Sequence, residues 1–178
     1  SFLLADPDWV AYWRERLSRL GSGPKIGFSW RSRVLKGERA LACSRLQDWG
    51  ELVRIPGVHW ICLQYDDCEA DLHEARERFG VTLHRFDEVD YFDDLDEVAA
   101  LMSALDLVVS APTTVSMQAA ALGVETWQMT YGVDWHAHGA NRHPWLPAVL
   151  RFQRACGEPW ERFLSSVAQK LRARLNPT

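Results

Sequence analysis

The sequence predicts an α/β fold in which a mostly parallel sheet is covered by helices on both faces. Short apolar runs rich in β-branched and aromatic residues alternate with amphipathic segments of helical length. This alternation is typical of parallel sheets, whose buried strands read as continuous apolar runs. A chain of 178 residues, 47% hydrophobic and 25% charged, suits one domain with its own core. We therefore expect a single three-layer domain over residues 1–178.

Short apolar runs bounded by Gly, Pro or polar clusters predict the strands. In chain order these segments are 24–30, 58–65, 81–86, 105–109 and 124–129. The stretch 131–158 lacks a periodic pattern, so irregular structure is expected there.

Start and stop signals predict the helices between these strands. Asp6 before Pro7 is a typical N-cap, and Gly21, Gly80 and Gly123 suit helix ends. Two further starts are a capping box of Ser44 with Gln47 and the pair Asp94 with Glu97. The last helix is expected from Pro159 to Leu175. Tryptophans at periodic apolar positions are expected in the core: Trp9, Trp13, Trp49 and Trp160.

Composition excludes several classes of protein. A net charge of −4 argues against a general binder of nucleic acid or anionic membranes. No apolar run reaches the roughly 18 residues of a membrane span, and no secretory signal is visible. Four cysteines without C-x-x-C spacing indicate a reduced, cytoplasmic protein. The chain begins without Met, so we expect an excised domain whose upstream portion is missing.

Polar side chains follow three of the predicted strands, where ligands bind in open parallel sheets. After the first strand come Ser29 and a cationic loop, in which Arg31 and Lys36 suit a diphosphate. Gln64 and Tyr65 close the second strand, where a base or ribose could lie. The alternatives are a solvated loop that aids solubility and a buried, hydrogen-bonded glutamine.

The turn in "SAPTTVSMQAAALGVETW" joins a buried strand to a short helix. Thr113, Thr114 and Ser116 lie where the helix has free N–H groups and the positive end of its dipole. These residue types bind phosphate or simply cap the helix.

Two segments invite a metal interpretation that their spacing disfavours. The acidic run 87–97 lacks the glycine that a calcium loop needs, and it suits a helix start. His136 and His138 lack cysteine partners at zinc spacing. We therefore expect no metal site.

Four segments, in this order, carry a resemblance to a known family: "KIGFSWRSR", "WICLQYDD", "FDDLDEVAALMSALDLVVSAPTTVSMQAAALGVETW" and "HPWLPAVLRF". Through them the chain resembles heptosyltransferase-like glycosyltransferases, specifically the C-terminal, nucleotide-sugar-binding half of these GT-B enzymes. The resemblance covers nearly the whole chain and is greatest for relatives fused behind tetratricopeptide repeats. The resemblance implies a Rossmann-like domain, with an acceptor-binding N-terminal domain outside this chain.

By resemblance, "APTTVS" matches the family's D-T-x-x-x-H turn, which holds the nucleotide diphosphate, and Thr113 matches its threonine. Pro112 and Met117 replace the family's Asp and His. The turn is also similar to the His–Thr–Thr turn of the O-linked N-acetylglucosamine transferases, with Pro112 in place of its His. In the family this segment is a loop that borders the donor site, which makes Asp134 or Trp135 a candidate sugar contact.

The resemblance implies a donor-binding half of a glycosyltransferase that acts on a protein or glycan acceptor. The nucleotide-diphosphate sugar is then a substrate, and no cofactor is expected. The general base would come from the missing domain, so the isolated chain should turn over little or nothing. Two alternatives stay open: a degenerate, non-catalytic interaction module, which Pro112 and Met117 favour, and a nucleotide-sugar epimerase-like domain.

Overall fold

The computed structural model describes residues 1–132 and 143–176, which form a six-stranded sheet covered on both faces. The strand order is β3-β2-β1-β4-β5-β6, and every pairing is parallel. The strands are β1 (Lys25–Ser29), β2 (His59–Cys62), β3 (Leu83–His84), β4 (Leu107–Ser110), β5 (Thr126–Tyr131) and β6 (Val149–Arg154).

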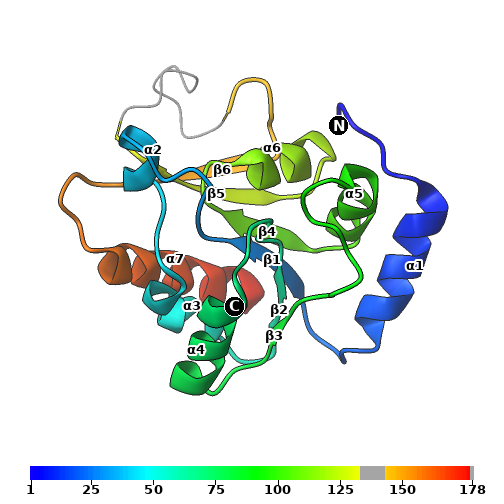
Figure 1. Cartoon of the computed structure of the whole chain (residues 1–178), viewed down its shortest axis with the longest axis horizontal. Helices are drawn as coiled ribbons and strands as arrows, with labels where there is room; N and C mark the ends of the chain where they lie inside the picture. The colour runs from blue at the N-terminus through cyan, green and yellow to red at the C-terminus, as the bar shows by residue number, and fades with distance from the viewer. Residues whose placement is uncertain (133–142, 177–178) are drawn as a thin grey trace.

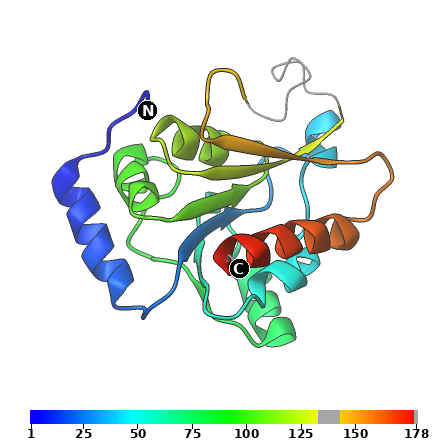
Figure 2. The same cartoon turned by 180° about the vertical axis from the view of Figure 1, so that it is seen from behind.

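Helices cover the sheet as two layers (Figures 1 and 2), which confirms the predicted three-layer α/β fold. One face packs against α1, α5 and α6 around Trp13, and the other against α3, α4 and α7 around Trp60. The helices are α1 (Pro7–Ser18), α2 (Glu38–Leu41), the 3-10 turn η1 (Leu46–Trp49), α3 (Gly50–Val53), α4 (Glu69–Phe79), α5 (Leu95–Ser103), α6 (Thr114–Ala121) and α7 (Trp160–Leu175). Within the described ranges, no helix is both long and apolar enough to cross a membrane.

Several predicted helix ends are confirmed at atomic detail. The Asp6 carboxylate caps α1 by accepting from the backbone N–H of Asp8 at 2.8 Å. Asp94 caps α5 by accepting from Glu97 N at 3.0 Å. Gly80 ends α4 with a left-handed φ of +63°, which side chains with a Cβ rarely adopt.

The predicted capping box of Ser44 with Gln47 is wrong, because the N-cap residue is Arg45, one position later. The Asp48 carboxylate accepts from Arg45 N at 3.0 Å, which is only half of a capping box, since an arginine side chain has no acceptor for the return bond. The Ser44 hydroxyl instead accepts from Trp49 Nε1 at 2.8 Å. The buried indole N–H of Trp49 takes the hydroxyl that the spacing assigned to the helix.

Two other predictions are corrected. The segment expected to be irregular contains β6, whose pattern is obscured because it is an edge strand with exposed or half-buried Arg151 and Gln153. Trp9 is not in the core. It is 49% exposed, because α1 buries the face that carries Trp13 and leaves Trp9 outside that face.

Candidate functional site

The candidate site lies where β1 and β4 run side by side in the middle of the sheet. From these two strands the chain continues toward opposite edges, which makes this the topological switch point of the sheet. Ser29 pairs in register with Ser110, and Ala111 N donates to Ser29 O at 2.9 Å. The loop after β1 and the turn after β4 therefore emerge together at the carboxyl edge, where open α/β sheets bind ligands.

Thr113 occupies the N-cap position of α6 without capping the helix. Its backbone is extended and its side chain makes no cap hydrogen bond. The hydroxyl is buried and has no hydrogen-bond partner among the described residues. A buried polar atom without a partner costs free energy, so this hydroxyl is one that a ligand can satisfy.

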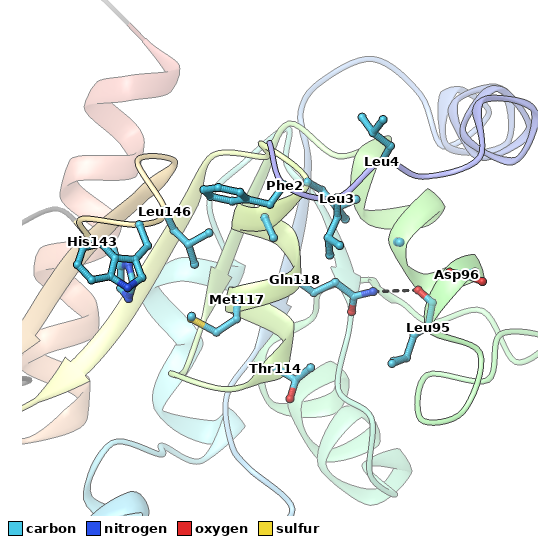
Figure 3. A pocket seen from close by; sticks show the side chains of 14 residues that line it. Phe2, Leu3, Leu4, Leu95, Asp96, Thr114, Met117, Gln118, His143 and Leu146 are labelled. Atoms are coloured by element: carbon cyan, nitrogen blue, oxygen red, sulfur yellow. Dashed lines mark hydrogen bonds between the residues drawn. The ribbon is translucent and has the colours of Figure 1, made fainter. Parts of the chain in front are cut away.

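Thr114 and Ser116 differ in how their side chains are used. Thr114 is exposed at the first position of α6 (Figure 3). The Ser116 hydroxyl is buried, donates to Thr113 O at 2.9 Å, and accepts from Gln128 Nε2 at 2.9 Å. Ser116 therefore shapes the turn, and its backbone N–H is one of the helix's first donors, which have no carbonyl partner within the helix.

Gln64 ties the carboxyl end of β1 to that of β2. It is fully buried, and its Oε1 accepts from Ser29 Oγ at 2.9 Å and from Trp30 N at 3.2 Å. Its Nε2 donates to Arg31 O at 3.0 Å and to Asp66 Oδ1 at 2.7 Å. With its polar atoms engaged in this way, Gln64 positions the start of the loop, and Ser29 is held in the same network.

Arg31 is bound to the loop between β2 and α4. Its guanidinium contacts Asp66 at 3.0 Å, the Asp67 carbonyl at 2.9 Å and the carboxylate of Asp71 on α4. Burial acts to lower the pKa of Arg31, but the two carboxylates outweigh it and raise the pKa. Arg31 therefore anchors the cationic loop that follows β1, whereas Lys36 lies exposed five residues further along that loop.

Two further side chains hold the cationic loop, and the spacing of the sequence did not reveal one of them. Tyr65 Oη accepts from Arg33 N at 3.1 Å. Arg154, buried at the end of β6, donates to Leu41 O at 2.8 Å, and its guanidinium lies 4.4 Å from the ring centroid of Trp160. Contacts across 113 residues leave no signal in local spacing, so Arg154 was missed.

An apolar cavity of about 890 Å³ opens along α6 beside the turn. Figure 3 shows Met117 and Gln118 of α6 facing it, with Phe2 and Leu3 along one side and His143 and Leu146 along another. Gln118 is engaged, since its Nε2 donates to Leu95 O at 2.9 Å. The lining is almost wholly apolar, so the cavity suits a hydrophobic surface better than a sugar.

The remaining candidates fall outside this centre. Asp134, His136 and His138 lie outside the described residues. In the acidic run, Asp90 accepts from the N–H groups of Phe92 and Asp93, each at 2.9 Å. Across residues 1–132 and 143–176, no cluster of three His, Cys, Asp or Glu side chains is arranged to hold a metal ion.

No protein-family profile matches the sequence. Protein FlbA of Caulobacter vibrioides (strain ATCC 19089 / CIP 103742 / CB 15) is 37% identical over 172 residues. That match covers 97% of this chain and 29% of FlbA. The chain thus spans less than a third of the curated relative's length.

Solved glycosyltransferases share the fold at low sequence identity. A glycosyl transferase family 9 protein of Veillonella parvula matches at 15% identity with a TM-score of 0.60, over 97% of this chain and 52% of its own. The E. coli ADP-heptose lps heptosyltransferase II matches at 16% identity with a TM-score of 0.61, over 97% and 53%. Anabaena HepE, solved in complex with UDP-glucose, matches at 17% identity with a TM-score of 0.52, over 96% and 44%. The chain therefore has the fold of about half of a GT-B glycosyltransferase.

Proposed function

We propose that this chain is the nucleotide-diphosphate-sugar-binding half of a glycosyltransferase. In this proposal the diphosphate lies over the start of α6, against the Thr113 hydroxyl, the exposed Thr114 and the free N–H groups of the first turn. Lys36 reaches the phosphates from the loop after β1, and Arg31 holds that loop in place. Asp134 contacts the sugar.

The observation that carries the proposal is the buried, unpartnered hydroxyl of Thr113 at the switch point of the sheet. A structural cap would bond its own helix, and Thr113 does not. Cations and helix N–H groups stabilise a departing nucleoside diphosphate, which is the main electrostatic task of glycosyl transfer without a metal.

The fold match supports a nucleotide sugar as the ligand, since the similar structures include proteins described as an ADP-heptose heptosyltransferase and a UDP-glucose complex. We propose a protein or glycan acceptor and no cofactor. We further propose one domain over residues 1–178, an N-terminal acceptor domain, upstream tetratricopeptide repeats and a cytoplasmic location. Because a general base would come from the acceptor domain, the isolated chain should bind the donor with little or no transfer.

One other function has a specific observation in its favour, namely a non-catalytic interaction module. Met117, where the resembling enzymes have His, is 40% exposed and lines the apolar cavity rather than offering a polar group to a phosphate. In that case the nucleotide site would be a remnant and the cavity would be the functional surface.

Titration of the chain with UDP, GDP, ADP, CDP and their sugar conjugates tests the proposal. The expected result is selective binding of one nucleotide by calorimetry, lost in the Thr113→Ala/Thr114→Ala variant. Absence of binding by a folded wild-type chain would favour the interaction module.

A further inference from the structure

Two buried cysteines that the proposed function does not use lie in contact behind the site. Cys62 is the last residue of β2, and Cys68 is the N-cap residue of α4. Their sulfur atoms are 3.9 Å apart, and both side chains belong to the apolar core on the α4 side of the sheet.

The guanidinium of Arg85 contacts both sulfurs. Its Nη1 lies 3.6 Å from Cys62 Sγ and 3.3 Å from Cys68 Sγ, and it also donates to Gln64 O at 2.6 Å. Burial acts to raise the pKa of Cys62, but the hydrogen bond from Cys68 and the charge of Arg85 outweigh it and lower the pKa. The same hydrogen bond, together with burial, raises the pKa of Cys68. Of the two sulfurs, Cys62 is therefore the one that loses its proton more readily.

Arg85 also links the pair to a pocket. A pocket of about 430 Å³ is lined by Arg85 together with Tyr65, Asp66 and Asp67. Because Arg85 also touches both sulfurs, a small oxidant in this pocket meets a residue that is in direct contact with the thiols.

We propose that Cys62 and Cys68 form a reversible disulfide when the protein meets a hydroperoxide, and that this disulfide loosens the cationic loop of the site. With hydrogen peroxide, the Cys62 thiolate attacks one oxygen and breaks the O–O bond, leaving a sulfenic acid and hydroxide. The Cys68 sulfur then attacks the Cys62 sulfur, forms the S–S bond and expels hydroxide, which leaves with the Cys68 proton as water. The two thiols are oxidised and the peroxide is reduced.

The geometry connects this bond to the loop. A disulfide of about 2.05 Å requires the sulfurs to approach by about 1.9 Å, and in this proposal the start of α4, the segment 63–67, or both take up part of that movement. These are the two elements that hold Arg31, through Asp71 on α4 and through Asp66 and the Asp67 carbonyl in the segment. In the proposal, closing the disulfide thus displaces the partners that anchor the loop carrying Lys36.

Peptide mapping of the Cys43→Ser/Cys156→Ser variant tests the bond, because this variant leaves only Cys62 and Cys68. After peroxide treatment, differential alkylation should show both thiols blocked, and the tryptic peptide that carries both cysteines should hold an internal disulfide that dithiothreitol opens. The proposal is overturned if both thiols stay alkylatable after unfolding, or if oxidation stops at sulfinic acid without a cross-link.

Limited trypsin digestion of the same variant tests the effect on the loop without any ligand. Cleavage after Arg31 and Arg33 should become several-fold faster in the oxidised form, and reduction should restore the original cleavage rate. The Cys62→Ser and Cys68→Ser changes, made one at a time in this background, should show no peroxide response. Equal cleavage before and after disulfide formation would refute the link to the loop.

The consequence for binding rests on the proposed function. If the chain binds a nucleoside diphosphate, the oxidised form should bind it several-fold more weakly than the reduced form. Equal affinity in the two forms would overturn this consequence. Failure of both forms to bind would instead count against the proposed function, while mapping and digestion still decide the disulfide.

Discussion

Two buried threonines at the carboxyl edge of the sheet differ in whether their hydroxyl has a hydrogen-bond partner. Substituting each of them therefore distinguishes an effect on ligand binding from an effect on stability. Thr113 Oγ1 has no hydrogen-bond partner in the described part of the chain, whereas Thr130 Oγ1 donates to Phe152 O at 3.4 Å. Each is nine-tenths or more buried. At this edge of the sheet the Thr113 hydroxyl is available to a ligand, whereas the Thr130 hydroxyl is engaged within the fold.

Replacing Thr113 with valine should leave the free energy of unfolding unchanged or slightly raised, because no hydrogen bond is lost. Diphosphate affinity should fall about tenfold or more, since a hydrogen bond to a charged group contributes about 1.5–3 kcal/mol. Thr130→Val is the matched control; because its bond to Phe152 O is long, it should lose at most about 1 kcal/mol of stability, with unchanged affinity. If Thr113→Val instead costs the roughly 1 kcal/mol of a lost cap and leaves affinity intact, the residue is only structural. Denaturant unfolding and calorimetry give both values.

Substitutions of the two cations of the loop, Lys36 and Arg31, should also have different effects. Lys36→Met should weaken diphosphate binding with little change in stability, because Lys36 is exposed. Arg31→Met should lower the free energy of unfolding by about 1–3 kcal/mol, since it removes the guanidinium that pairs with the carboxylates of Asp66 and Asp71. The same two measurements apply, and an exchange of these two effects between the variants would contradict the assigned roles.

At the scale of elements, the short strand β3 carries a titrating residue. The His84 ring lies 5.9 Å from that of His59 at the opposite end of β2 from the site. Burial first, and then the positive charges of His59, Arg76 and Lys25, lower the pKa of His84. The unfolded chain therefore binds more protons than the folded one as pH falls below the ordinary histidine value of about 6.5.

His84 should accordingly stabilise the fold above about pH 6.5, and this contribution should be lost as pH falls through that value toward the folded-state pKa. His84→Gln should flatten the fall in unfolding free energy between roughly pH 7 and 5. The exposed His73 of α4 offers a control, and His73→Gln should leave most of the slope. Urea titrations across pH measure both, and an unchanged slope in His84→Gln would count against the assignment.

At the scale of the whole molecule, the alternation of strands and helices was enough to predict a parallel sheet covered by a layer of helices on each face. Buried runs such as β1 and β4 are readable because both faces are covered, and Asp6 and Asp94 are readable because caps act within three residues. The edge strand β6 was not readable, since Arg151 and Gln153 break its apolar run. The turn between β4 and α6 follows a strand that was readable, so its position could be predicted from the sequence.

The division of labour within the site was not available from the sequence. Arg31 and Lys36 look alike in a cationic loop, but only the fold shows that Asp66 and Asp71 hold the first. Thr113 and Ser116 look alike in a hydroxyl cluster, but only the fold gives Ser116 its partner Gln128. Long-range partners decide which polar groups are engaged, and they leave no local pattern.

The most direct test of the central claim is an amide NMR titration of the ¹⁵N-labelled chain with the nucleoside diphosphate that binds best. The largest shifts are expected at residues 113–116 and along 29–37, which meet at the switch point between β1 and β4. The matching nucleoside without phosphates should leave residues 113–116 nearly unmoved. Saturable binding that shifts other amides while residues 113–116 stay still would contradict a diphosphate site at the start of α6.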